Sequence, residues 1–549
     1  MSASNKKKLR NEQNAAKMTE KQLAQQKEAK KLKLYTSIFV GVVALFLVIA
    51  MFAGINQVIS SNGIREKNTV GVTLGEHKLN NAELNYYYID AVNEFYSNYG
   101  TYASLFGLDV TKPMDDQVYD EAAGTTWADY FVDTAVENAR SIYALNDAAK
   151  AAGHTISEAE KTSTENALAQ IELYAMLYGY DVDTYLKAMY GNGATMDSYR
   201  SYIEMSALAS SYYNAYSNSL TYDDAALRAA EADKYNEYSS YSFNYYYVAA
   251  NKFLQGGTTA EDGTVTYSDE EKAASVAAAE EAAKMLTAEE ITSIEALDAA
   301  IAGLSINEGT EVASTVCEDY RYASVSELYR DWIIDDARVA GDMTYVENST
   351  TSTDADGKEV KTVSGYYVLS WNGVNDNIFA LKNVRHILVA FEHDHNEAEE
   401  HDHNSTSYTD EEKAAALAEA EAILNEWKTG EATEASFADL ANAKSADGDG
   451  TTGGLYEDIY PGQMVAPFED WCYDASRAVG DTGIVESTYG YHVMYFVGNS
   501  ETNYRDHLIS SDLASEELSG WYTAICDGLT ITKGDTRYVD RDMILRANG

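Results

Sequence analysis

The feature that most constrains the fold of this 549-residue chain is an internal repeat with a period of about 140 residues. The segment YSDEEKAA at Tyr267–Ala274 returns as YTDEEKAA at Tyr408–Ala415. Ser268 and Thr409 are each followed three positions later by glutamate, which predicts a capping box at the start of an alanine-rich helix. Two copies indicate a duplicated module, since a solenoid needs at least three repeats.

Other segments match in the same order along the chain and complete the repeat. RDWIIDDARVAGDMTYVE at 330–347 matches EDWCYDASRAVGDTGIVE at 469–486, and SGYYVLSW at 364–371 matches YGYHVMYF at 489–496. Strand-like and helix-like segments are mixed within each copy, so each is expected to be an α+β module. We place the modules at residues 241–380 and 381–500, and the first has an added hydrophilic hairpin, STTSTDADGKEV.

The second module contains short motifs that resemble the parvulin-type peptidyl-prolyl isomerases. They are RHILV at 385–389, FADLA at 437–441, SAD at 445–447, GG at 453–454, GQMVAPFEDW at 462–471 and YGYHV at 489–493. The motifs follow the family's order over about 110 residues. The resemblance implies a domain that interconverts the cis and trans forms of X–Pro bonds and needs no cofactor.

The resemblance also assigns roles to individual residues. The family's central histidine pair falls on His386 and His492, and the acidic or thiol position beside it falls on Asp447. The apolar cup for the proline ring falls on Met464 and Phe468, with Tyr456 where a leucine is usual. The sequence departs from the family after Gly454, where GGDLG reads GGLYED, so that pocket wall is expected to differ in shape from the family's.

The chemistry of the reaction fits these residue types. Rotation about an X–Pro bond meets a barrier of ~18–20 kcal/mol because it breaks amide resonance. No bond is made, so the site needs only to hold the proline ring and to prefer the twisted amide. Met464 and Phe468 are suited to the first task, and a hydrogen-bonded set of His386, His492 and Asp447 to the second.

The first module lacks this set of residues. Tyr245 stands where His386 does, Tyr367 stands where His492 does, and the GG–GQM–PF stretch has no clear equivalent. We expect this module to keep the scaffold without the chemistry, leaving substrate holding or domain spacing as its role.

A single uncharged stretch, residues 34–55, is long enough to cross a ~30 Å hydrocarbon core as a helix. The preceding residues 1–33 contain ten Lys and Arg against three acids, which predicts a cytoplasmic tail and an extracytoplasmic remainder. A cleaved signal peptide is the alternative, and the long basic leader argues against it. Residues 56–70 are expected to form a short polar stalk.

The expected fold is therefore α+β, with a transmembrane helix, a mainly helical chaperone domain at 71–240 and two tandem parvulin-like modules. Helical patterns at 127–149, 158–178 and 196–216 define the chaperone domain. Residues 501–549 are expected to complete it through an apolar helical stripe and a strand that pairs with VGVTL near Val70. This order resembles membrane-anchored foldases of the SurA, PrsA and PpiD types.

Composition limits the possible partners. The chain has 40 Lys and Arg against 88 Asp and Glu, a net charge of −48, and so has no electrostatic reason to bind nucleic acid. Its three cysteines, Cys317, Cys472 and Cys526, are far apart and are expected to be buried or half-buried free thiols. Unfolded or secreted client polypeptides containing X–Pro bonds are the expected partners, together with the membrane.

Two other functions remain possible from the sequence. One is a holding chaperone without enzymatic activity, in which both modules are scaffolding. The other is a metal-binding surface protein that uses the acidic loop FEHDHNEAEEHDHNSTS, whose imidazoles are competent metal ligands. A solvated low-complexity loop is the simpler interpretation of this segment. The candidate ligands are His393, His395, His401 and His403.

Overall fold

The computed structural model describes residues 17–18, 63–109, 111–232, 234–353, 357–392, 408–448 and 450–541. The predicted membrane span, the four loop histidines and all of the basic tail except the short strand β1 (Lys17–Met18) lie outside these ranges. Within them, no helix is both long and apolar enough to cross a membrane. The chain divides into two compact units, with described parts at 222–513 and at 63–221 plus 514–541.

The second of these units is mainly helical. The helices predicted from residues 127, 158 and 196 are confirmed, and α3 occupies part of the segment expected to be a polar stalk. Its elements are α3 (Ile64–Asn68), β2 (Val70–Leu74), β3 (His77–Asn80), α4 (Asn81–Tyr99), η2 (Gly100–Phe106), η3 (Met114–Asp116), β4 (Val118–Asp120), β5 (Thr125–Thr126), α5 (Trp127–Ala151), α6 (Glu158–Leu177), α7 (Val182–Tyr190), α8 (Met196–Ser219), the end of α16 (Tyr504–Asp527) and β16 (Ile531–Lys533).

Hydroxyl and amide side chains determine where these helices begin. Asn80 caps α4 and Thr126 caps α5, each in a reciprocal capping box with the acidic residue three positions later. Ser157 forms such a box with Glu160 at the start of α6, and Thr195 forms one with Ser198 at the start of α8. Each box satisfies backbone donors that the first helical turn leaves without an internal partner.

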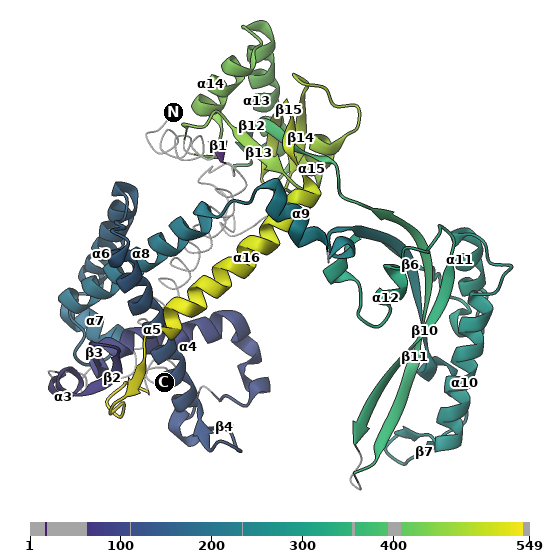
Figure 1. The fold of residues 1–549 in the computed structure, drawn as a ribbon, viewed down its shortest axis with the longest axis horizontal. Helices are drawn as coiled ribbons and strands as arrows, with labels where there is room; N and C mark the ends of the chain where they lie inside the picture. Colours follow the sequence, from purple (N-terminus) through teal and green to yellow (C-terminus); the bar gives the residue numbers. More distant parts are fainter. Residues whose placement is uncertain are drawn as a thin grey trace. The chain divides into compact units, whose positions relative to one another are not determined.

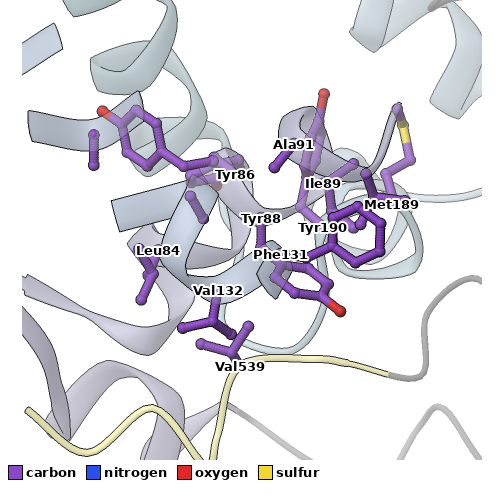
Figure 2. Close-up of a cluster of buried hydrophobic side chains, with 14 of the residues drawn as sticks. Leu84, Tyr86, Tyr88, Ile89, Ala91, Phe131, Val132, Met189, Tyr190 and Val539 are labelled. Atoms are coloured by element: carbon purple, nitrogen blue, oxygen red, sulfur yellow. The ribbon is translucent and has the colours of Figure 1, made fainter. Parts of the chain in front are cut away.

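The tyrosine-rich stripe of α4 forms the core of the helical unit. Tyr86 and Tyr88 are almost completely buried and pack with Phe131 and Tyr190 (Figure 2). The Tyr86 hydroxyl is hydrogen-bonded to Ser198 Oγ at 2.8 Å, so the buried phenol keeps a polar partner. The abundant tyrosines of α4 are thus mainly core residues.

The C-terminal segment returns to the helical unit. Strand β16 pairs antiparallel with β2, with Ile531 opposite Leu74, which is the pairing expected from the sequence. Val539 then enters the same core beside Val132 (Figure 2). The boundaries differ from those expected at 240 and 501, because residues 222–240 and 501–513 belong to the other unit. The cause is an apolar cluster in which Leu508 and Ile509 of α16 pack with Leu227 and Leu381.

Removing residues 529–549 should lower the thermal stability of the helical unit. The deletion takes away the β16 strand and the buried Val539 while leaving α16 intact. Thermal unfolding of the full chain, followed by circular dichroism at a helix wavelength, should show the helical transition at a lower temperature. Unchanged unfolding would mean that this segment contributes nothing to the unit.

The remaining unit, residues 222–513, contains both repeats. They are preceded by α9 (Asp224–Ala232) and η4 (Tyr235–Tyr238). The first repeat comprises β6 (Ser240–Ala249), η5 (Ala250–Phe253), β7 (Thr258–Thr259), β8 (Val265–Thr266), α10 (Asp269–Leu286), α11 (Ile294–Ala302), η6 (Ser305–Asn307), β9 (Thr315–Arg321), η7 (Tyr322–Ser324), α12 (Arg330–Ile333), β10 (Met343–Thr353) and β11 (Glu359–Asn375). The second comprises β12 (Ala380–Ala390), α13 (Asp410–Thr429), α14 (Glu434–Lys444), β13 (Leu455–Ile459), α15 (Ala466–Tyr473), β14 (Thr482–Ser487) and β15 (Gly490–Asn503).

The two repeats have the same sheet topology. Neighbouring strands run β10-β11-β6-β9 in the first and β14-β15-β12-β13 in the second, and every one of these pairs is antiparallel. The expected capping boxes at Ser268 and Thr409 begin α10 and α13. The added hairpin of the first repeat extends β10 and β11 into a long ribbon beside α10 (Figure 1).

Candidate active site

Two neighbouring strands bring the predicted histidines together. His492 of β15 lies opposite Leu388 of β12, and His386 lies opposite Met494. Directly opposed residues and residues two apart share one face of a sheet, so both imidazoles project from the same face. Their Nδ1 atoms are 3.1 Å apart, and only 2% and 6% of His386 and His492 are exposed.

A short loop after α14 brings Asp447 to this pair. Asp447 Oδ2 lies 3.1 Å from His386 Nε2 and accepts a 2.7 Å hydrogen bond from the Tyr456 hydroxyl. The loop is fastened to β12, because Leu388 N–H donates to Ser445 Oγ at 3.0 Å and Ala446 N–H donates to the Leu388 carbonyl at 2.7 Å. The predicted trio of two histidines and one aspartate therefore converges.

One pair of tautomers satisfies every contact of the two imidazoles. The approach of His386 Nε2 to the Asp447 carboxylate places a proton on Nε2, so its Nδ1 accepts from Nδ1–H of His492. His492 Nε2 is then an acceptor for Ser487 Oγ at 2.7 Å, while Ser487 Oγ accepts from Tyr489 N–H at 3.1 Å. The chain of contacts runs from Ser487 to Tyr456.

The glycine pair of the GG motif allows the backbone before β13 to pack closely against β12 at His386. His386 N–H donates to the Gly454 carbonyl at 2.8 Å, and Gly454 has φ +66°. A Cβ at Gly454 would lie 2.2 Å from the His386 carbonyl oxygen, so any side chain would push β12 away. The neighbouring Gly453 carbonyl accepts a 2.9 Å hydrogen bond from Arg385 Nη1.

The predicted proline cup is only partly available in the structure. Phe468 is completely buried, with its ring centroid 5.3 Å from those of both His386 and His492. Tyr456 is 5% exposed and packs 4.9 Å from the His386 ring, while Met464 is half-buried in the loop before α15. Phe468 and Tyr456 therefore pack directly against the imidazoles, and of the three residues Met464 has the most open surface.

Two serines of the site were not singled out from the sequence. Ser445 belongs to the SAD motif, where only the aspartate received a role, and it fastens the loop to β12. Ser487 ends β14 opposite Gly490, which places its hydroxyl beside His492. A tight turn between two strand patterns, ESTYGYH, is the sequence signal that predicts a contact across this hairpin.

Buried His492 should make the stability of the domain depend on pH. Burial, together with neighbouring His386, lowers the pKa of His492 to about 3 against the opposing effect of the Asp447 charge. An unfolded histidine titrates near 6.5, so below that pH the unfolded chain binds a proton that the folded chain does not. Stability should therefore fall as the pH drops from 6.5 towards 3, by up to about 1.4 kcal/mol per unit.

Thermal unfolding of the wild-type chain and of His492→Gln at several pH values checks this expectation. The variant has no titrating imidazole at this position, so its stability should decline less steeply between pH 6.5 and 4. Parallel pH profiles for the two proteins would contradict it.

The first module has the same strand register without the histidines. Tyr367 lies opposite Tyr247, two residues beyond Tyr245, as His492 lies opposite the residue two beyond His386. The Tyr245 and Tyr367 ring centroids are 5.9 Å apart, and Tyr329 packs on Tyr367 as Phe468 packs on His492. These tyrosines therefore stand at the positions of the histidine pair, as the offset of the repeat predicts.

The fold and the converged residues are those of a parvulin-type domain. Residues 371–499 match the family model described as the PPIC-type PPIASE domain, and this segment is a peptidyl-prolyl isomerase domain of that type.

The curated relatives found are foldases. Foldase protein PrsA 1 of Listeria innocua is 36% identical over 111 residues, and Foldase protein PrsA 1 of Listeria monocytogenes is 35% identical over 111 residues. Each match covers 19% of this chain and 36% of the relative, so the chain matches little more than a third of their length. The crystal structure of the peptidylprolyl isomerase PrsA from Bacillus anthracis covers 28% of this chain and 59% of its own, at 21% identity and a TM-score of 0.18.

Proposed function

We propose that the protein is an extracytoplasmic foldase in which residues 371–499 isomerise X–Pro bonds of client polypeptides. The observation that carries this proposal is the unbroken set of contacts from Ser487 through His492, His386 and Asp447 to Tyr456. Such a set fixes the orientation of polar groups beside the substrate amide before the substrate binds.

The proposed mechanism is stabilisation of the twisted amide. The proline ring would rest on the apolar side chains near Met464, and the amide would lie against the polar set anchored by Asp447. During rotation the carbonyl oxygen loses charge and the nitrogen becomes pyramidal, so groups held in fixed orientations can favour this state over both planar forms. An acceleration of about a thousandfold requires about 4 kcal/mol of such preference.

A cis/trans assay on a panel of X–Pro peptides with the full chain tests the proposal. We expect faster isomerisation with wild-type protein and no loss of rate when the first module carries Tyr245→Leu. Absence of acceleration across the panel would leave a holding chaperone without enzymatic activity as the better description.

A cavity of about 500 Å³ in the helical unit supports a client-holding role in addition to isomerisation. Helix α8 and the end of α16 present matching sets of side chains, with serines flanked by an apolar residue and a tyrosine. The lining residues are Ile142, Leu145, Ser206, Ala209, Ser210, Tyr213, Ser515, Leu518, Ser519 and Tyr522. Such a lining provides apolar surface together with adaptable hydroxyl partners for a bound segment.

Charge indicates which segments this cavity should prefer. The described residues of the helical unit contain 12 Lys and Arg against 27 Asp and Glu. No basic residue follows Arg200 in α8, and none occurs in α16 after Leu513, where Glu516 and Glu517 lie beside the lining serines. The proposed occupant is therefore an apolar client segment flanked by lysine or arginine.

Filling the cavity should weaken this binding without affecting isomerisation. In Ser210→Phe the new ring enters the cavity, whereas Ala215→Phe changes an exposed position of the same helix and serves as the matched control. Fluorescence titration with a nine-residue apolar peptide flanked by lysines should show several-fold weaker binding to Ser210→Phe only. Equal binding by both variants, or equal binding of a glutamate-flanked peptide, would contradict the assignment.

We further propose that residues 34–55 anchor the protein in the membrane, with residues 1–33 in the cytoplasm. The uncharged stretch and the basic residues before it support this topology. Protease protection of residues 1–33 in sealed cells, with accessibility of the modules after wall removal, would test it.

A further inference from the structure

We propose that Tyr456 is a positioning residue of the isomerase site, whose hydroxyl holds the Asp447 carboxylate against His386. This inference rests on the proposed isomerase function and gives Tyr456 a role different from that of a wall of the proline cup. The hydroxyl donates to Asp447 Oδ2 at 2.7 Å, and the same oxygen lies 3.1 Å from His386 Nε2. One carboxylate oxygen thus receives both the phenol and the imidazole.

The arrangement of the tyrosine supports this role. Tyr456 lies on β13 opposite Val384 of β12, and its ring packs edge-on at 4.9 Å from the His386 ring. Only 5% of Tyr456 is exposed, so its ring offers a substrate little surface while its hydroxyl is engaged. The leucine usual at this position in the family could fill similar space but has no donor. The departure GGLYED therefore adds a hydrogen bond to the site.

The hydrogen bond from Tyr456 has a carboxylate, Asp447, as its acceptor. A donor to a carboxylate stabilises its ionised form, and hydrogen bonds to charged groups are stronger than those between neutral groups. Burial and the Asp447 charge raise the pKa of Tyr456 well above its ordinary value, so the phenol remains a donor at any pH the protein meets. Titratable groups reach Asp447 from three strands, as His386 from β12, Tyr456 from β13 and His492 from β15.

The consequence is a site that stays organised in mildly acidic conditions. An ionised Asp447 holds His386 with its proton on Nε2, and this leaves His386 Nδ1 free to accept from His492. Without the phenol the carboxylate takes up a proton at a higher pH. Protonation of Asp447 would remove the charge that orients the imidazole pair.

Tyr456→Phe in the full chain tests the inference, because it removes the hydroxyl and keeps the ring. On X–Pro peptides between pH 4 and 8, kcat should fall about tenfold with little change in KM, as expected for loss of a hydrogen bond to a charged group. The acid limb of the rate profile should move to higher pH. The matched control is Tyr491→Phe, which removes a tyrosine hydroxyl donating to Glu486 at 3.2 Å in the same domain.

The outcomes separate this inference from the proposed function. An unchanged kcat and acid limb in Tyr456→Phe, with wild-type protein active, would overturn the role of Tyr456 and leave the isomerase intact. An inactive wild-type protein would instead overturn the proposed function. The pKa of the Asp447 carboxyl, followed by carbon-13 nuclear magnetic resonance, decides the positioning role independently of activity. It should rise in Tyr456→Phe, and an equal pKa in both proteins would overturn the role.

Discussion

Replacing His386 by leucine should remove most of the isomerase activity, lowering kcat/KM by about a hundredfold, or roughly 3 kcal/mol of transition-state stabilisation. His386 is the central member of the polar set, since its two ring nitrogens contact His492 and Asp447. Leucine preserves much of the buried volume but breaks both contacts. The measurement is the rate of cis/trans isomerisation of X–Pro peptides in the presence of the full chain.

Two controls make this result specific. Tyr245→Leu changes the register-equivalent position of the first module and should keep wild-type activity. Asp447→Asn keeps the size of the side chain and should also lower activity, so loss of folding can be distinguished from loss of chemistry by comparing thermal unfolding. A His386→Leu protein that folds normally and retains activity within threefold would rule out catalysis by the histidine pair.

Replacing Arg505 by methionine should cost about 3–5 kcal/mol in stability of the unit formed by residues 222–513. Arg505 is 1% exposed, and its guanidinium pairs with Glu231 and lies 4.0 Å from the centre of the Tyr235 ring. It also donates to the Tyr235 carbonyl at 2.6 Å and to the Asp376 carbonyl at 3.0 Å. Methionine retains the apolar stem but removes one of the two cations paired with the largely buried Glu231, whose other carboxylate oxygen still pairs with Arg228.

The measurement is thermal unfolding followed by tryptophan fluorescence, because four of the six tryptophans lie in this unit. Adding Glu231→Gln to Arg505→Met removes the carboxylate that has lost one of its two cationic partners and should recover part of the loss. Arg477→Met is the matched control, since Arg477 stacks on Trp471 at 4.0 Å and is more exposed. Equal small effects of Arg505→Met and Arg477→Met would show that the buried guanidinium contributes little.

Much of the candidate site could be predicted because its residues belong to short contiguous motifs. His386 and His492 each lie in a strand pattern, and the order of the parvulin-like motifs around them assigns both to one site. The capping boxes of α10 and α13 were predictable for the same reason, since their two partners are three residues apart.

Features that depend on contacts between distant residues could not be predicted in this way. The sequence predicts Tyr456 as part of the apolar cup, and it gives no sign that the tyrosine hydroxyl donates a hydrogen bond to Asp447. Similarly, the apolar stripe of α16 predicted that the helix needs a partner but not that its partners differ along its length. Leu508 packs with Leu227, whereas Tyr522, fourteen residues further on, packs against Tyr213.

The closure of the helical unit by β16 and Val539 has a consequence for how the protein is made. Asn81 donates to the carbonyl of Asp535, a contact between residues 454 positions apart. During synthesis from the N-terminus, the β2 edge stays unpaired and the α4–α5 core stays incomplete until residues 531–539 have emerged. The Asn81–Asp535 contact closes a loop of 454 residues, but both repeats lie within that loop and can fold first. The part of the loop that is still flexible is then much shorter, so the conformational entropy lost on closing it is smaller. The isomerase-type domain at residues 371–499 would therefore be complete before the helical unit.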